Sequence, residues 1–187
     1  MQSKEMLDHR ILFLSEVVTA EAANDLVAGL LLLDADDHEA QIDLYLNSPG
    51  GSMSDGMAIV DTMTCVSAPV STICIGQAAS MAALILAAGA PGRRLVTPNA
   101  EVMIHQASAG MSGHTSDIRL FTDRMVRLQE HMERLLAGWT GQTVERIRED
   151  MKIDCWMTAQ EAVAYGLVDA VIEPPAQAGA VASGETA

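Results

Sequence analysis

The fold is decided by Gly76-Gln77-Ala78-Ala79-Ser80-Met81-Ala82-Ala83-Leu84, a stretch in which a strand gives way to a helix. It follows the β-branched apolar run 70–75, which is typical of a short buried strand. It leads into an Ala-, Leu- and Met-rich run that ends near Gly89 and is long enough for about three helical turns. Ser80 is therefore expected near the start of a buried helix, where free N–H groups and the helix dipole can hold an oxyanion. Serine is also an ordinary helix cap, so Ser80 alone identifies no site.

Outward from this stretch, strands and helices alternate along the chain. The other strands are expected at 10–14, 42–46, 93–96, 102–104 and 168–172. The other short helices are expected at 19–33, 55–66, 143–151 and 158–166, the last opened by a capping box. This regular alternation predicts βαβ units with right-handed crossovers, a largely parallel sheet and an α/β fold.

A longer helix is expected from Ser116 to Trp139, because apolar residues recur there every three or four positions over about six turns. Two interpretations of its apolar stripe stay open: burial against a partner, and burial in the core of the same chain. We expect one domain over 1–172, in which a protruding segment covers about 105–138. Residues 173–187 are rich in Pro, Gly, Ala and Ser and are expected to be disordered.

Composition excludes several classes of function. The net charge of −14 over 187 residues argues against a nucleic-acid partner and against binding to an anionic membrane surface. The most apolar stretch, around 79–90, is shorter than the roughly 20 residues that a membrane-spanning helix needs, and the first residues form no signal peptide. Three widely spaced cysteines favour a reducing compartment. We therefore expect a soluble cytoplasmic protein.

Residues suited to acyl transfer follow the expected strand ends. Ser80, Gly51 in the turn 47–51, and His105 each come just after a strand, and sites in parallel α/β sheets form at the carboxyl edge. Serine chemistry needs a base, a carboxylate that orients the base, and donors for the oxyanion. His114, in a loop, is the only rival base. Spacing does not select the carboxylate, and three candidates stay open: Asp150, Asp154 and Asp169.

Other chemistries have no motif in the chain. The sequence contains no Gly-x-Ser-x-Gly elbow, no phosphate-binding loop, no Gly-x-Gly-x-x-Gly and no His-Glu-x-x-His. Metal ligands at useful spacing are also absent from the sequence. We therefore expect no metal and no cofactor in this chain.

Four motifs in order resemble those of the Clp protease proteolytic subunit (ClpP) family, whose fold is shared with the crotonases. The motifs are Asn47-Ser48-Pro49-Gly50-Gly51, Gly76-Gln77-Ala78-Ala79-Ser80-Met81, Met103-Ile104-His105-Gln106 and Glu161-Ala162-Val163-Ala164-Tyr165-Gly166-Leu167-Val168-Asp169. Any one of them alone is a weak signal. Together, at family-like spacing from about Arg10 to Ile172, they are specific.

The resemblance implies a serine endopeptidase that degrades unfolded proteins to short peptides inside a ring-shaped chamber. It implies that Ser80 is the nucleophile, His105 the general base and Asp154 the carboxylate that fixes the imidazole. The backbone N–H groups of Gly51 and Met81 would form the oxyanion hole. The family forms two stacked heptameric rings joined by a handle helix. An AAA+ unfoldase docks outside the rings and consumes the ATP, so this subunit would need no cofactor.

Several departures from the family pattern leave a second hypothesis about the function open. The chain starts almost at its first strand, so we expect it to lack most of the segment that lines the axial pore. Ala107 stands where proline is usual, Cys155 where an arginine often links the rings, and Asp43, near a retained Tyr45, where an aromatic residue often lines the docking pocket. The second hypothesis is a non-catalytic or conditionally active ring subunit that needs a second, ClpP-like paralogue. A third, an acyl-CoA hydratase or isomerase of the crotonase type, gives Ser80 no role.

Overall fold

A seven-stranded sheet forms the centre of the molecule in the computed structural model, which describes residues 3–173. The strands are β1 (Ile11–Leu14), β2 (Ile42–Ser48), β3 (Val70–Ala79), β4 (Arg94–Val96), β5 (Glu101–Ile104), β6 (Cys155–Thr158) and β7 (Ala170–Val171). The main order is β1-β2-β3-β4-β7, and β5 pairs with both β3 and β6. Every pairing is parallel except that of β5 with β6. The α/β fold with a mostly parallel sheet is therefore confirmed.

The helices are α1 (Lys4–Asp8), α2 (Ala20–Asp36), α3 (Met53–Cys65), α4 (Met81–Ala87), α5 (Thr115–Thr140), α6 (Val144–Asp150) and α7 (Ala159–Tyr165). Their starts follow the sequence signals. The side chains of Thr19, Ser52 and Thr143 accept N-terminal hydrogen bonds of α2, α3 and α6. Thr158 and Glu161 form the predicted capping box of α7. Gly166 ends α7 in the left-handed conformation that glycine adopts without strain.

The helix α4 is the centre of the hydrophobic core. All seven of its side chains are buried, and it packs against β3 and α3. It is shorter than predicted, because it ends at Ala87, and the strand before it is longer than predicted, because the strand expected at 70–75 continues to Ala79. The extension is stabilised by pairing that local propensity does not reveal: residues 77–79 form a parallel ladder with β5. The change from strand to helix therefore falls at Ser80.

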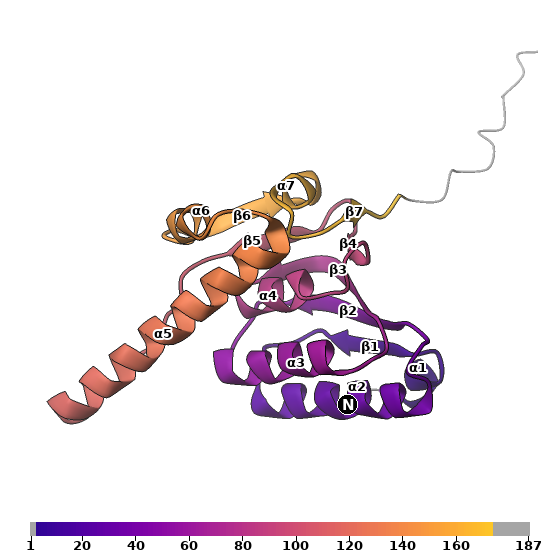
Figure 1. The fold of residues 1–187 in the computed structure, drawn as a ribbon, viewed down its shortest axis with the longest axis horizontal. Coiled ribbons are helices and arrows are strands. Elements are labelled where there is room, and N and C mark those ends of the chain that lie inside the picture. Colours follow the sequence, from indigo (N-terminus) through magenta and orange to yellow (C-terminus); the bar gives the residue numbers. More distant parts are fainter. Residues whose placement is uncertain (1–2, 174–187) are drawn as a thin grey trace, which may run out of the picture.

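The helix α5 divides into two parts. Figure 1 shows that it extends far from the sheet and that α6, which follows it, lies beside β6. Its C-terminal part packs on the core through Met132 and Leu136, both buried. Towards its N-terminus, Ile118, Leu120 and Val126 remain exposed. Burial in the core of the same chain therefore holds for the C-terminal part of the helix, and burial of the rest against a partner stays a prediction.

Two elements were not predicted, α1 and β6. The missed strand β6 has four residues, of which only Met157 is buried, so its periodicity is weak. It runs antiparallel to β5 and forms an outer edge of the sheet. The expected disordered tail lies outside the described residues, apart from Glu173. Among the described residues, no helix is both long enough and apolar enough to span a membrane.

Candidate active site

The strand β3 changes partner halfway along, and this brings Ser80 to β5. Residues 72–74 pair with β4, whereas residues 77–79 pair with β5. Between them Gly76 has a positive φ of 80°, and a Cβ there would lie 2.7 Å from the Asn47 side-chain oxygen. Glycine is thus required at the bend for both reasons. Beyond the bend, the Ser80 N–H donates to the Met103 carbonyl at 2.8 Å, two residues before His105.

The antiparallel pairing of β5 and β6 brings His105 and Asp154 together. Ile104 lies opposite Cys155 in the register. His105 follows Ile104, and Asp154 precedes Cys155, so the two side chains leave the sheet at the same end of the ladder. Their 49-residue separation in sequence is therefore closed by one strand pair that the sequence pattern did not reveal.

Ser80, His105 and Asp154 form a continuous hydrogen-bonded row. The distance from His105 Nε2 to Ser80 Oγ is 2.9 Å, and that from His105 Nδ1 to Asp154 Oδ1 is also 2.9 Å. When the Ser80 O–H donates to Nε2, the proton of neutral His105 must be on Nδ1. The Nδ1–H group then donates to the Asp154 carboxylate. The His105 side chain is 27% exposed, and that of Asp154 is 63% exposed.

The structure also decides among the alternatives that the sequence left open. The Asp169 carboxylate binds Arg94, and the Asp150 carboxylate binds Arg146 and the Tyr165 hydroxyl. Neither therefore reaches His105. The rival base, His114, is exposed at the start of α5. The remaining histidines, His9, His38 and His131, are exposed as well.

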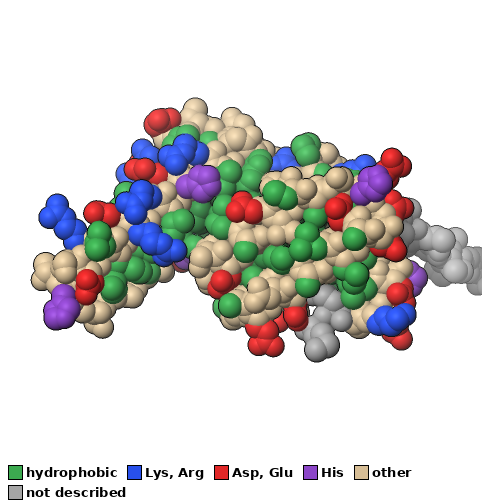
Figure 2. Space-filling model, turned by 60° about the horizontal axis from the view of Figure 1, so that its bottom comes forward, with side chains coloured by type: hydrophobic (Ala, Val, Ile, Leu, Met, Phe, Trp, Pro, Cys, Tyr) green, Lys and Arg blue, Asp and Glu red, His purple; other side chains and the backbone are tan. Residues whose placement is uncertain are grey.

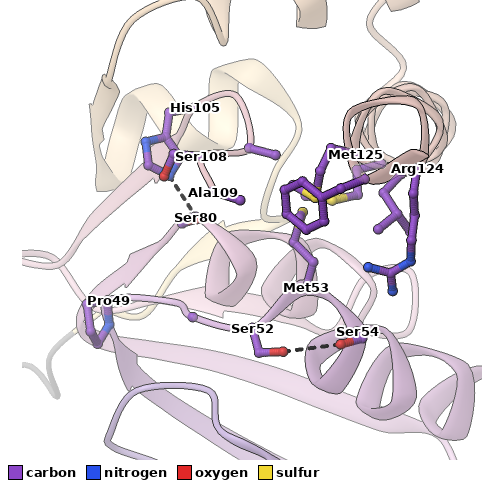
Figure 3. Close-up of a pocket in the computed structure, with 15 residues that line it drawn as sticks. Pro49, Ser52, Met53, Ser54, Ser80, His105, Ser108, Ala109, Arg124 and Met125 are labelled. Atoms are coloured by element: carbon purple, nitrogen blue, oxygen red, sulfur yellow. Dashed lines mark hydrogen bonds between the residues drawn. The ribbon is translucent and has the colours of Figure 1, made fainter. Parts of the chain in front are cut away.

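Ser80 has a strained backbone, and its hydroxyl does not cap the helix that follows. Its φ of 56° and ψ of −121° lie outside the regions that serine readily adopts. It precedes α4, but its side chain makes no capping hydrogen bond. The hydroxyl points instead to His105, as Figure 3 shows. The ordinary capping role considered for Ser80 is therefore wrong for its side chain.

Two backbone amides beside Ser80 are available for a ligand. Met81 is the first residue of α4, so its N–H has no acceptor within the helix. Gly51 lies in a parallel bridge with Val18 that uses the Gly50 carbonyl and the Ser52 N–H, and the Gly51 N–H is outside this bridge. A Cβ at Gly50, where φ is 88°, would lie 2.9 Å from the Met81 nitrogen. Glycine at position 50 thus allows the turn to approach the serine closely.

The row opens into a cavity of about 510 Å³ between the sheet and α5. Ser80 and His105 lie on the side of the cavity away from Arg124 (Figure 3), and Gly51 lines the cavity as well. Its apolar lining comes from Met53, Phe121, Met125, Leu128 and Met132. The cavity can therefore hold an apolar side chain next to the serine and the two amides.

One cationic side chain, that of Arg124, lines this cavity. Seven of the eleven Lys and Arg residues lie between Arg119 and Lys152, together with six Asp and Glu residues, so this segment is close to neutral although the net charge of the chain is −14. Figure 2 shows Lys and Arg side chains gathered over the projecting helix. Arg124 lines the cavity opposite Ser54 (Figure 3). No cluster of metal-binding side chains occurs in residues 3–173.

Comparison with known protein families identifies the family of this chain. The family model described as Clp protease matches residues 1–175, nearly the whole chain. The matched range includes every residue of the hydrogen-bonded row, the turn 47–51 and the helix α5.

Proposed function

Because the chain belongs to the Clp protease family, we propose that it is a serine endopeptidase subunit in which Ser80 is the nucleophile. The observation that carries this proposal is the unbroken row from Ser80 Oγ through the His105 imidazole to Asp154 Oδ1, with 2.9 Å at each step. A hydroxyl, an imidazole and a carboxylate in this order are what acyl transfer at neutral pH requires.

In the proposed reaction, Ser80 Oγ attacks the carbonyl carbon of a peptide bond while its proton passes to His105 Nε2. Asp154 accepts a hydrogen bond from Nδ1–H, which holds the imidazole in the right tautomer and stabilises the imidazolium that forms. His105 then gives the proton to the leaving amine, and an acyl-enzyme remains on Ser80. A water molecule, deprotonated by His105, hydrolyses this ester and regenerates the serine.

The oxyanion is assigned to the N–H groups of Gly51 and Met81. The Gly51 N–H makes no hydrogen bond of the bridge with Val18, and the Met81 N–H makes none within α4. Donors fixed by the backbone stabilise the negative charge of the tetrahedral intermediate without having to reorganise. Removal of one such donor typically costs a factor of about 10² to 10³ in rate.

The substrate is assigned as an extended, unfolded polypeptide. The cavity beside Ser80 has an apolar lining, which suits an apolar side chain next to the scissile bond. A folded protein does not present such a segment. We therefore propose that a partner AAA+ unfoldase delivers the chain and consumes the ATP, that the products are short peptides, and that this subunit uses no cofactor.

The proposed assembly is two stacked heptameric rings, with α5 in the handle between them. Exposed apolar side chains on α5 (Ile118, Leu120 and Val126) and on α2 (Leu31 and Leu32) support association with further subunits. The three cysteines are free, which agrees with a location in the reducing cytoplasm.

A second candidate function is a ring subunit that becomes active only with a paralogous partner. The observation that favours it is the exposure of Asp154, whose carboxylate is 63% accessible and is followed by Cys155. A contact supplied by another subunit could complete this end of the row. Native mass spectrometry of the protein alone and with its paralogue, read with peptidase activity, separates the two functions.

A fluorophosphonate probe tests the proposal directly, because it reacts only with an activated serine. We expect one label on Ser80, no label in Ser80→Ala and a large decrease in His105→Ala. The matched control is Ser108→Ala, which removes another hydroxyl that lines the cavity and should be labelled normally. An assembled protein that leaves the probe unreacted would contradict the proposed function.

A further inference from the structure

A buried carboxylate in α5 has no part in the reaction described above. Glu133 is only 3% exposed, although it is charged. Arg148 from α6 donates to Glu133 Oε2, with 2.8 Å from Nη2 and 3.0 Å from Nε. The Gln129 amide donates to the other oxygen, Oε1, at 3.0 Å. Because a buried charge is costly unless it is paired and hydrogen-bonded, these contacts hold the Gln129 amide in one orientation.

The opposite end of the Gln129 amide reaches the segment that carries His105. Gln129 Oε1 accepts a hydrogen bond from the Ala107 N–H at 2.7 Å. The preceding N–H, that of Gln106, donates to the Met151 carbonyl at 2.7 Å. The two residues after His105 are thus held from two sides, by α5 and by the end of α6.

Only a residue with an N–H at position 107 can make the contact with Gln129. Proline, the residue usual there in the family, lacks this donor. Alanine at position 107 leaves an N–H that is half-buried and needs an acceptor. The contact therefore depends on both Ala107 and Gln129.

We propose that Gln129, oriented by Glu133 and Arg148, is a positioning residue for His105. The chain of hydrogen bonds fixes the backbone just after the imidazole, and thereby the distance from Nε2 to Ser80 Oγ. Gln129 does not line the cavity at Ser80. It lines a separate cavity of about 350 Å³, together with Gln106, Ala107 and Glu133. Its effect on the rate is therefore exerted through the backbone, and the inference rests on the proposed function of His105.

A double-mutant cycle tests this inference in the full-length assembled protein. Its members are the unchanged chain, Gln129→Leu, Ala107→Pro and the double variant. We expect Gln129→Leu to lower kcat about fivefold, the ratio that corresponds to one hydrogen bond of about 1 kcal/mol, with KM unchanged. In the Ala107→Pro background the same substitution should change kcat by less than about twofold, because the donor is already absent.

The control and a second measurement separate positioning from folding. Glu130→Leu makes a similar apolar change at the next position of α5, in the wall of the same cavity, and should leave kcat unchanged. Hydrogen exchange at the Ala107 amide should become faster in Gln129→Leu, whether or not the enzyme is active.

Three results would overturn the inference, and each points to a different step. An equal loss of kcat in both backgrounds would show that Gln129 acts through helix packing. Unchanged exchange at Ala107 would show that the hydrogen bond is not formed in solution. A wild-type protein that the fluorophosphonate probe does not label would overturn the proposed function, and with it the catalytic meaning of the contact.

Discussion

The two ends of the hydrogen-bonded row differ in how the chain holds them. Ser80 lies between β3 and α4, where all seven residues of the helix are buried, and its N–H is bonded to Met103. Asp154 lies in a short connection before β6, and its side chain is 63% exposed. The hydrophobic core of the chain thus fixes the serine end, whereas the carboxylate end depends on one strand pair and one hydrogen bond.

This difference has an energetic consequence. An exposed carboxylate is surrounded by water and salt, which weaken its interaction with the imidazole. The same carboxylate would interact more strongly if another subunit covered it. We infer that the serine end is formed in the isolated chain, and that the strength of the carboxylate end is set by its surroundings.

The largest expected effect is on kcat, which should fall further when the base is removed than when the carboxylate is. His105→Ala should lower kcat by a factor on the order of 10⁶, and Asp154→Asn by one on the order of 10⁴. Peptide hydrolysis measures both. Asp150→Asn is the control, because that carboxylate binds Arg146 and Tyr165 instead. A kcat of Asp154→Asn close to that of the unchanged chain would show that the exposed end makes no contribution.

The next effect tests how closely the turn at Gly50 packs against Ser80, measured as a change in the free energy of unfolding. In Gly50→Ala the new Cβ would lie 2.5 Å from the Ala79 carbonyl oxygen and 2.8 Å from Ser80 Cβ, at a φ of 88°. We expect a loss of about 2–5 kcal/mol in the free energy of unfolding, from left-handed strain and overpacking together. Urea unfolding measures it.

Gly92→Ala is the matched control for this variant. Gly92 has a similar φ of 78°, but a Cβ there would have no atom within 4 Å. The free energy of unfolding of Gly92→Ala should fall only by the cost of the left-handed strain, about 1–2 kcal/mol. Equal losses at both positions would mean that the close approach of the turn to Ser80 adds nothing to the cost.

A third effect contrasts Asp154 with an anchored carboxylate. Asp169 is 22% exposed and binds Arg94, which also donates to the carbonyls of Trp139 and Gly166. Burial alone would raise the pKa of Asp169, but the hydrogen bonds from Arg94 outweigh it and lower the pKa below its ordinary value. The folded state therefore binds this proton more weakly than the unfolded state does.

The sign of the pH dependence follows from this lowered pKa. The stabilisation by Asp169 should be complete above the unfolded pKa, about 3.9, and should be lost as the pH falls through the lower folded value. Asp169→Asn should thus cost about 1–3 kcal/mol of unfolding free energy at pH 7, and less at acidic pH. Asp154→Asn should cost almost nothing at pH 7. A large cost for Asp154→Asn in urea unfolding would contradict the contrast between the two carboxylates.

The smallest expected effect concerns substrate preference. Arg124 is exposed in the cavity wall, so its attraction for an acidic substrate residue is partly screened. Arg124→Gln should lower kcat/KM for a peptide with Glu near the scissile bond by about twofold to fivefold, relative to the same peptide with Gln. High salt should reduce the difference. Arg119→Gln, on the same helix but outside the cavity lining, should leave the ratio unchanged, and an unchanged ratio in Arg124→Gln would refute the preference.

The sequence predicted the serine end more fully than the carboxylate end. The alternation of strands and helices, and the position of His105 after a strand, follow from local patterns. Asp154 could be preferred to Asp150 and Asp169 only through the family resemblance, because the short strand β6 was missed. The length of β3 was also underestimated, since its last residues are stabilised by pairing with β5. In both cases strand formation depended on a partner distant in sequence.

The amino-acid sequence by itself determined the α/β class, the caps of α2, α6 and α7, and the placement of Ser80 and His105 just after strands, because these depend on periodicity, capping chemistry and strand ends. Only the tertiary structure decided which carboxylate meets the imidazole, that the Ser80 hydroxyl is free of capping, and that α5 packs on the core only towards its C-terminus. Those features arise from strand register and packing between distant segments, which no local pattern encodes.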